Sequence, residues 1–240
     1  MRHLAWAALL LGSALSLAQA GEMLQPGDYL EDQTLSVLRA TRSPNQAIGD
    51  GLKREIPQAI QVRQTDAGLT FEANWNWHEW EVVFVRHADG KLFAADCGGE
   101  GCGFSLPAGA EPDRPDHFHA VYRGRPIGYT RVGNSDRTIV TSALVGSYTD
   151  AKGGKVVFGA DGTLRGAALA GQFLLQNDHV FDRFDFFLLG PKETQRVIAF
   201  RWIDGVLSLF PVTPFVEDRP GWGEPDYHHP IAVLRPTAER

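Results

Sequence analysis

The chain has 240 residues, of which 23 are basic and 29 acidic, and its formal net charge is −6. This balance argues against nucleic acid or an anionic membrane surface as the main partner. Hydrophobic residues make up 43% of the chain and aromatic residues 10%, which excludes a disordered protein. The 26 glycines and 14 prolines favour many short strands joined by tight turns.

The first twenty residues have the pattern of a secretory signal peptide. Met1-Arg2-His3 is a short positive lead, residues 4–17 are an apolar run too short to cross a bilayer, and Ala18-Gln19-Ala20 is a small-x-small cleavage pattern. We expect the mature chain to begin at Gly21. No cysteine lies at this junction, and no later segment is apolar for long enough to be transmembrane. A periplasmic or secreted protein without a lipid anchor is therefore predicted.

The two cysteines, Cys97 and Cys102, lie in one segment with three glycines between them. In an oxidising compartment such a pair can close a small loop, so we predict a disulfide bond. A metal or redox role is the weaker interpretation, because a lone pair supplies only two ligands and the Cys-x-x-Cys spacing is absent.

One helix is expected near the start of the chain. Residues 33–41 follow an acidic pair that can cap a helix, and Leu35 and Leu38 share one face of it. Pro44 is expected to end the helix, and residues 45–57 to form a polar connection.

The segment from Leu69 to Phe93 holds three of the six tryptophans and is predicted to be central to the fold. Its first half alternates apolar and polar residues, as a strand with one buried face does. The parity changes after Trp77, so we expect a bulge or turn at His78-Glu79. The apolar positions before and after the change are Leu69, Phe71, Ala73 and Trp75, and then Trp80, Val82 and Phe84.

Strand and turn signals continue through the rest of the chain. The predicted fold is all-β, an antiparallel barrel of about ten strands with one short N-terminal helix. Residues 21–240 are expected to form a single barrel-like domain, with a possible sub-boundary near 143–146. The later strands are expected over residues 118–123, 127–132, 138–144, 155–158, 172–175, 184–189, 196–203, 206–210 and 231–234.

A short pattern occurs twice, as Gly27-Asp28-Tyr29 and as Gly146-Ser147-Tyr148. Each copy opens a long stretch of chain. Two occurrences of three residues are explained by chance, so the pattern alone does not predict a repeat.

Residues 146–150 are Gly-Ser-Tyr-Thr-Asp, and Val156-Val157-Phe158 and then Ala-Asp-Gly-Thr-Leu at 160–164 follow them. With these motifs, residues 144–210 resemble the lipocalin-like β-barrel proteins that bacteria export, so the predicted barrel is expected to be lipocalin-like or calycin-like. Tyr148 stands where the more usual lipocalin signature has tryptophan. The resemblance implies a barrel fold with a possible ligand cavity, and it carries no catalytic residues across.

His117 and His119 form the most suggestive polar cluster. On a strand they project from the same face and could both bind one divalent metal ion. Further ligands would have to come from elsewhere, and Asp226 and His228 in a late loop are the candidates, with His229 beside them. An exposed polar strand edge is the alternative interpretation.

Trp75, Trp77 and Trp80 could line a cavity for a small apolar ligand, because aromatic walls with few polar groups are typical of such pockets. Filling of the barrel core is the favoured alternative.

Catalytic signals are weak. There is no Gly-x-Ser-x-Gly elbow, and Asp182 and Asp185 are interpreted as the solvated face of a strand. We expect an exported non-catalytic barrel protein that binds a small apolar ligand or acts as an envelope docking module. The alternative is a metal-binding protein or metal-dependent hydrolase that uses His117 and His119. No other cofactor is expected.

Overall fold

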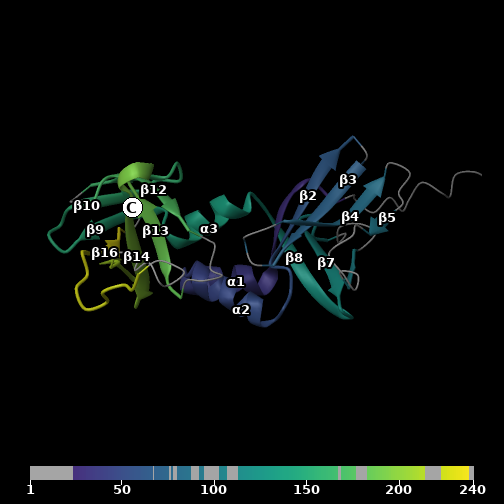
Figure 1. Ribbon diagram of the computed structural model, residues 1–240, viewed down its shortest axis with the longest axis horizontal. Helices are drawn as coiled ribbons and strands as arrows, with labels where there is room; N and C mark the ends of the chain where they lie inside the picture. Colours follow the sequence, from purple (N-terminus) through teal and green to yellow (C-terminus); the bar gives the residue numbers. More distant parts are fainter. Residues whose placement is uncertain are drawn as a thin grey trace, which may run out of the picture.

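The computed structural model describes residues 24–66, 68–75, 77, 80–87, 92–94, 103–106, 113–166, 169–176, 183–213 and 223–237. These residues form two antiparallel β structures at opposite ends of the molecule, with three α-helices between them (Figure 1). The predicted signal peptide and the predicted Cys97–Cys102 bond lie outside the described residues. No helix among the described residues is long and apolar enough to cross a membrane.

The N-terminal structure is an eight-stranded open sheet in the order β5-β4-β3-β2-β1-β8-β7-β6. It curls, because Phe84 of β4 and Phe104 of β6 bring their ring centroids within 6.5 Å although their strands belong to opposite halves of the sheet. Its strands are β1 (Gly27–Glu31), β2 (Ala59–Thr65), β3 (Gly68–Asn74), β4 (Glu81–His87), β5 (Leu92–Ala94), β6 (Phe104–Ser105), β7 (His117–Tyr122) and β8 (Arg125–Gly133).

The C-terminal structure is a closed barrel in which each strand pairs with the next, and the last strand pairs with the first. Closure leaves no sheet edge. Its strands are β9 (Gly146–Asp150), β10 (Lys155–Phe158), β11 (Thr163–Arg165), β12 (Gly171–Leu175), β13 (Asp185–Leu189), β14 (Arg196–Ile203), β15 (Val206–Pro211) and β16 (Ala232–Pro236), with the 3-10 turn η1 (Lys192–Thr194) before β14.

The two structures share one cyclic strand order. In the open sheet every consecutive pair of strands except β5 and β6 is hydrogen-bonded, and β1 pairs with β8. The described strands therefore lack only a β5–β6 pair to close the ring. The chain therefore contains two eight-stranded meanders, one open and one closed.

The twice-occurring tripeptide opens the first strand of each meander. Gly27 and Gly146 have φ angles of 142° and 156°, a range that L side chains rarely adopt. Tyr29 and Tyr148 follow at the same offset and are fully buried. The Tyr29 hydroxyl donates to the carbonyl oxygen of Gln25 at 2.9 Å, and the Tyr148 hydroxyl to that of Leu144 at 2.6 Å, each four residues upstream. The pattern thus marks equivalent positions in the two meanders.

Each meander encloses its own apolar core. In the barrel, Phe158, Phe173 and Phe187 contact one another with ring centroids 5.3 to 5.8 Å apart, and Phe200 adjoins Phe187 at 6.3 Å. In the open sheet, the concave face buries a second set of rings and aliphatic side chains, which includes Tyr29, Phe71, Val83, Phe118 and Tyr129. Side chains therefore fill the described interior of the barrel.

The helices join the two cores. Leu38 of α1 (Asp32–Thr41), Ala47 of α2 (Pro44–Lys53) and Ile139 of α3 (Ser135–Ala143) pack in the same cluster as the barrel interior. Leu35, also on α1, packs instead with Leu30 of the sheet. The helices thus cover one end of the barrel and the outer face of the sheet.

Two of these helices correct the sequence-based prediction of a single short helix. The first helix ends at Thr41, ahead of Pro44, but residues 45–57, which were expected to form a polar connection, belong mostly to α2. Pro44 begins α2, because Ser43 caps its N-terminus and proline is favourable in the first turn. Residues 138–144 were predicted to be a strand, yet most of them belong to α3, which Asn134 caps through a hydrogen bond from the Arg137 amide.

Three further expectations need correction. The described residues contain sixteen strands rather than about ten, and they are divided between two β structures rather than one barrel. The bulge or turn expected at His78-Glu79 lies outside the described residues. Val82, which was expected on the apolar face, is 38% exposed, whereas Val83 is fully buried at the point where β3 and β4 shift register. The alternation at Leu69, Phe71 and Ala73 is confirmed, since all three are buried.

Candidate functional site

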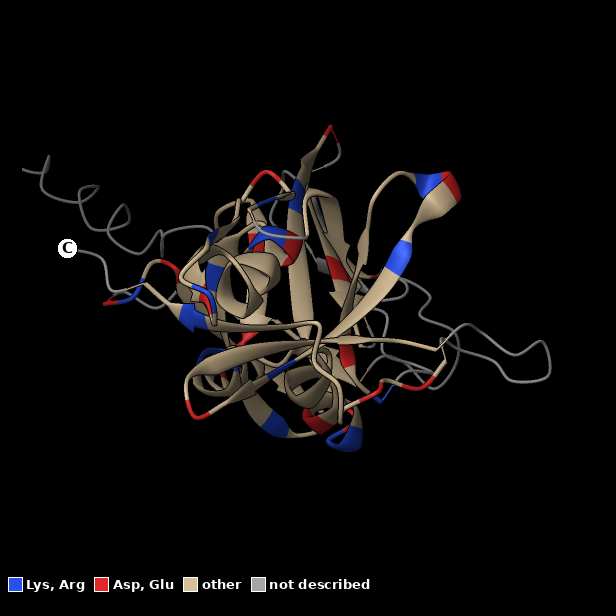
Figure 2. Ribbon diagram, turned by 90° about the vertical axis from the view of Figure 1, so that its left-hand side faces the viewer, with Lys and Arg blue, Asp and Glu red and all other residues tan. Residues whose placement is uncertain are grey.

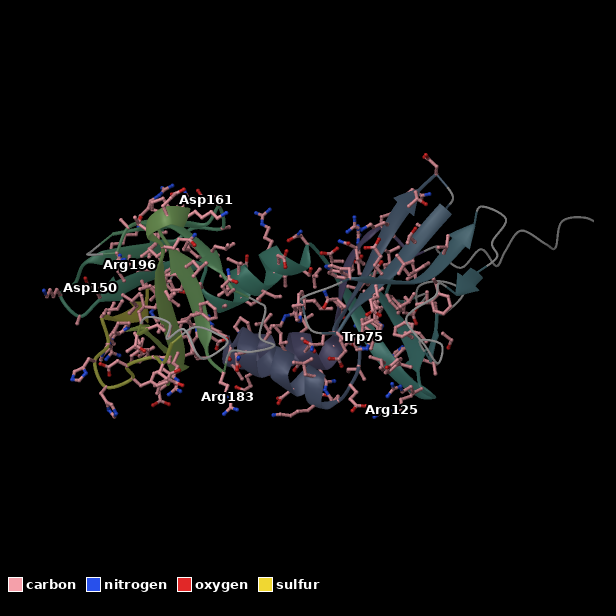
Figure 3. The ribbon with its side chains drawn as sticks, in the orientation of Figure 1. Trp75, Arg125, Asp150, Asp161, Arg183 and Arg196 are labelled. Atoms are coloured by element: carbon pink, nitrogen blue, oxygen red, sulfur yellow. The ribbon has the colours of Figure 1, made fainter. Side chains whose placement is uncertain are left out.

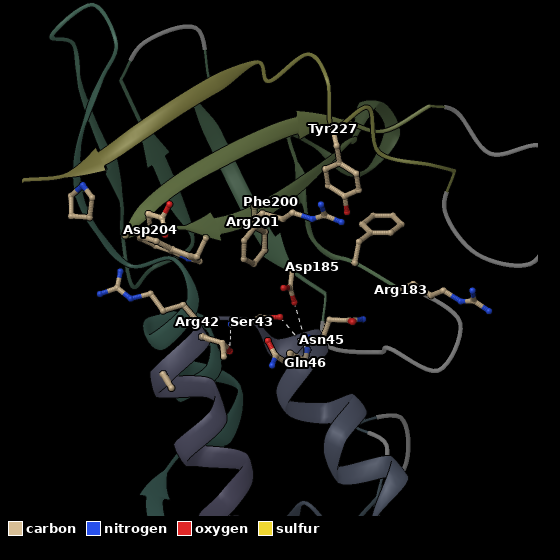
Figure 4. A pocket seen from close by; sticks show the side chains of 16 residues that line it. Arg42, Ser43, Asn45, Gln46, Arg183, Asp185, Phe200, Arg201, Asp204 and Tyr227 are labelled. Carbon is tan, nitrogen blue, oxygen red and sulfur yellow. Dashed lines mark hydrogen bonds between the residues drawn. The ribbon is translucent and has the colours of Figure 1, made fainter.

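A cavity of about 630 Å³ lies between the helix-covered end of the barrel and the corner that joins α1 to α2 (Figure 4). The barrel contributes residues from β13, β14, the β14–β15 turn and the β15–β16 connection. Its lining includes Thr41, Arg42, Ser43, Asn45, Gln46, Arg183, Phe184, Asp185, Phe200, Arg201, Trp202, Asp204, Tyr227 and Pro236.

The helix corner fixes one wall of this cavity. Arg42 takes a left-handed backbone conformation, with φ 55°, and its amide donates to the Leu38 carbonyl, which closes α1. Ser43 is extended and its hydroxyl accepts the Gln46 amide, which opens α2. The two helices therefore meet in a two-residue connection that holds the Arg42 and Ser43 side chains beside the barrel.

Two arginines at the cavity lie over aromatic rings. The Arg201 guanidinium carbon is 3.3 Å from the ring centroid of Tyr227, and that of Arg42 is 4.3 Å from that of Trp202. The Trp202 indole donates to the Ala143 carbonyl at 2.9 Å, so its ring is held against α3. A stacked guanidinium keeps its in-plane N–H groups available, and these groups match carboxylate and phosphate oxygens.

Asp185 lies buried between the barrel and the first turn of α2. Its carboxylate accepts the Asn45 amide at 2.6 Å and a hydrogen bond from the Ser43 side chain (Figure 4). Burial raises the pKa of Asp185 to about 6, although the bonds from Ser43 and Asn45 and the positive charge of Arg201 act to lower it. Asp185 is therefore an acid that changes charge close to physiological pH.

The cavity concentrates positive charge in an acidic protein. Lys and Arg are interspersed with Asp and Glu along the ribbon when the barrel faces the viewer (Figure 2). At the cavity, in contrast, three arginines stand against two aspartates, Asp185 and Asp204. In the close view Arg201 runs beneath Tyr227, while Arg42 and Arg183 extend toward the two sides (Figure 4). Protonation of Asp185 leaves only one acid against the three arginines.

The three tryptophans predicted to line a ligand site are placed in different surroundings, and none lines this cavity. Trp75 packs at the core of the open sheet and meets Tyr122 edge-on at 6.4 Å (Figure 3). Trp77 packs against the apolar cluster of the barrel interior and against the α1–sheet cluster, which consists of Leu30, Leu35 and Ala59. Its indole donates a hydrogen bond to the Gln58 side chain at 3.0 Å. Trp80 packs only with the α1–sheet cluster.

The predicted metal ligands lie in two separate parts of the fold. His117 and His119 are on β7 of the open sheet, with ring centroids 4.9 Å apart, whereas Asp226 and His228 follow β15 of the barrel. Among the described residues no group of three or more His, Cys, Asp or Glu side chains could hold a metal ion. The described structure thus does not supply the third ligand that the metal hypothesis requires.

His117 instead belongs to a polar contact between the sheet and α1. Its Nε2 lies 2.8 Å from Asp32 Oδ2, and the Thr130 hydroxyl donates to Asp32 Oδ1 at 2.6 Å. Burial acts to raise the pKa of Asp32, yet the bonds from Thr130 and His117 outweigh it and the pKa is lowered. A Cβ atom at Gly128 would collide with Asp32 Oδ2 and lie 3.0 Å from His117 Nε2, so only glycine leaves room for this contact.

Sequence reasoning missed the residues of the cavity. Asp185 was interpreted as solvated, although it is only 7% exposed, and its neighbour in that interpretation, Asp182, lies outside the described residues. One available signal was the run from Asp185 to Leu189, which is apolar after its first residue and does not alternate, as expected for a strand buried on both faces.

Neither the described fold nor the site can be compared with a relative, because no family model, curated protein or solved structure matches this chain.

Proposed function

We propose that this protein is a non-catalytic binding protein, and that the cavity between the barrel and the α1–α2 corner takes a small compound bearing a carboxylate or phosphate group. The observation that carries this proposal is the pair of arginines stacked on Tyr227 and Trp202 at one cavity of about 630 Å³. A volume in this range suits a small organic molecule.

A binding protein was also expected from the sequence, but the proposed ligand is anionic rather than apolar. A small apolar ligand in a cavity lined by Trp75, Trp77 and Trp80 was expected, whereas none of these residues lines the arginine-rich cavity. Phe158, Phe173, Phe187 and their neighbours occupy the described interior of the barrel. Interiors packed in this way leave few voids larger than a water molecule. The arginine-rich cavity at the barrel end is therefore the better-supported site.

The test is a calorimetric titration of purified protein with sulfate, as a tetrahedral anion, and with benzoate, as a planar carboxylate, at constant ionic strength. We expect saturable binding of at least one anion, and a loss of about tenfold or more in affinity for Arg201→Gln, since a charge-assisted hydrogen bond contributes roughly 1.5–3 kcal/mol. Arg196→Gln is the matched control, because Arg196 is exposed on the same strand and does not line the cavity. Equal binding by both variants would reject the site.

A second candidate site suits the small apolar ligand that the sequence predicted. A smaller cavity of about 360 Å³ lies near the β9–β10 turn and β16, and its lining includes Val156, Leu169, Ile231 and Leu234. Ile231 is 44% exposed at this cavity. A neutral probe such as N-phenyl-1-naphthylamine should gain fluorescence with the native protein and lose that gain with Ile231→Glu. An unchanged gain would exclude this cavity.

We further propose that the barrel is lipocalin-like and that the protein is exported. The closed order β9 to β16 supports the first point, because up-and-down closure of eight strands is the lipocalin architecture. Residues 1–20 support the second. Expression in a bacterial host should yield a periplasmic product that begins at Gly21 and has no free thiol, which N-terminal sequencing and thiol titration check.

A further inference from the structure

We propose that Asp185 couples proton uptake to anion binding at the arginine-lined cavity, so that the site binds its ligand more tightly in acid than at neutral pH. This inference rests on the proposed function. It also depends on an observation of its own, which is a buried carboxylate among the groups that would receive the anion.

The position of Asp185 supplies the coupling. Its carboxylate is within hydrogen-bond distance of the Asn45 amide and lines the same cavity as Arg201, whose positive charge acts on it. An ionised Asp185 therefore offsets part of the field that attracts an anion, and a neutral Asp185 does not. The interaction is strengthened by burial, because a charge held away from water is screened less.

Several other charged or titratable groups act on this region. Tyr227 faces Arg201 from the β15–β16 connection, and the charge of Asp185 reaches it. Asp204 lines the cavity but is exposed. His228 and His229 follow Tyr227, and His229 is paired with Asp226 at 2.8 Å. The groups on each element are Arg42 on the α1–α2 connection, Arg183 and Asp185 at β13, Arg201 and Asp204 at β14 and its turn, and Asp226, Tyr227, His228 and His229 after β15.

Burial determines the pH at which the coupling operates. Burial raises the pKa of Asp185 to about 6. Asp204 lines the same cavity but is exposed. An anion that prefers the neutral form of Asp185 must by reciprocity raise its pKa further. Couplings of this kind typically change affinity about 5-fold or more, which sets the expected size of the effect.

The experiment measures sulfate affinity at pH 5.0 and pH 7.5, with ionic strength held constant by chloride. Sulfate is chosen because it stays a dianion over this range. The native protein should bind sulfate about 5-fold or more tightly at the lower pH. Asp185→Asn should bind with nearly the same affinity at both pH values, because asparagine keeps an acceptor oxygen for Asn45 but cannot ionise. Asp204→Asn is the matched control and should tighten binding about equally at both.

The outcomes separate the two proposals. If the native protein shows no saturable binding of sulfate or benzoate at either pH, the proposed function fails. If sulfate binds but Asp185→Asn keeps the full pH dependence, only the coupling is overturned. Should Asp185→Asn not fold, carbon-13 NMR of the native Asp185 carboxyl replaces it. The apparent pKa must then rise when sulfate is added, and an unchanged pKa would overturn the coupling.

Discussion

Besides closure, the open sheet and the closed barrel differ in what connects their first two strands. In the barrel, β9 and β10 are joined by a tight turn in which Asp150 Oδ1 accepts the amides of Lys152 and Gly154. In the sheet, β1 and β2 are separated by the two helices α1 and α2. Because those helices pack against the end of the barrel, an insertion in one meander provides a wall of the cavity at the other.

Both the sheet and the barrel contain buried acidic residues, but only the buried acid of the barrel borders the candidate site. In the sheet, Asp28 and Glu31 are buried and bind the helices. The Asp28 carboxylate accepts hydrogen bonds from the amide and the hydroxyl of Ser135. The Glu31 carboxylate accepts hydrogen bonds from the Thr34 amide and the Arg54 guanidinium. The buried acid of the barrel, Asp185, also binds a helix, but it borders a cavity. Burial of an acid alone therefore does not identify a site.

Truncation of a buried phenylalanine in each core tests whether the two cores unfold together. Phe187→Ala in the barrel and Phe118→Ala in the sheet each remove a fully buried ring, and each should lower the free energy of unfolding by about 3–5 kcal/mol. Since Leu38 packs with the barrel core and Leu35 with the sheet, we expect one urea transition in both variants, measured by fluorescence and circular dichroism. Two separated transitions in Phe187→Ala, with one at the native midpoint, would show that the meanders unfold independently.

The next effect concerns the pH dependence of stability. The pKa of Asp185 is raised in the folded protein from 3.8 to about 6. Its stabilising contribution is therefore fully present below pH 3.8 and is lost as pH rises through about 6, a difference of up to about 3 kcal/mol. Urea unfolding at pH 4.5 and 7.5 should find Asp185→Asn less dependent on pH than the native protein and more stable than it at pH 7.5. A variant that is less stable at pH 7.5 would contradict the assigned direction.

Smaller changes in stability are expected at the middle position of the two copies of the tripeptide, Asp28 and Ser147. Asp28→Ala should cost about 2 kcal/mol, because the Gln61 amide group and the Ser135 donors lose a charged acceptor. Ser147→Ala, at the matching position of β9, should change stability by less than about 0.5 kcal/mol, since it is a half-buried side chain away from such a network. Thermal denaturation checks both, and equal costs would mean that the two strand openings carry the same polar role.

The smallest changes in stability are expected for the two buried tyrosines that open the meanders. Tyr29→Phe and Tyr148→Phe each remove one hydroxyl that donates to a carbonyl four residues upstream. Each variant should lose about 1 kcal/mol of stability by urea denaturation. A neutral result for one of the two would indicate that only the other tyrosine stabilises its strand opening.

Sequence patterns predicted the all-β class because alternation reports directly on which face of a strand is buried, as at Leu69, Phe71 and Ala73. They failed at α3, where β-branched Thr138, Ile139 and Val140 favour a strand by propensity while packing against the barrel stabilises a helix. α2 was missed because Gly49, Gly51 and Asn45 are weak helix formers.

The candidate site could not be predicted for a different reason. Arg42, Asp185, Arg201 and Tyr227 are distant in sequence and meet only because the barrel closes and the helix corner covers its end. No local spacing records that arrangement. The three tryptophans are close in sequence, yet Trp75 packs in the core of the open sheet, whereas Trp77 and Trp80 pack with the cluster between α1 and the sheet.

Hydrogen–deuterium exchange with and without sulfate distinguishes the proposed anion site at the end of the barrel from a site in the open sheet. Amides in residues 40–46, 183–185 and 200–205 should exchange more slowly with sulfate, because a ligand that binds the folded state suppresses local opening. Amides of β7, residues 117–122, should be unchanged. Slowing confined to β7, or absent from the cavity segments at saturating sulfate, would rule out an anion site at the end of the barrel.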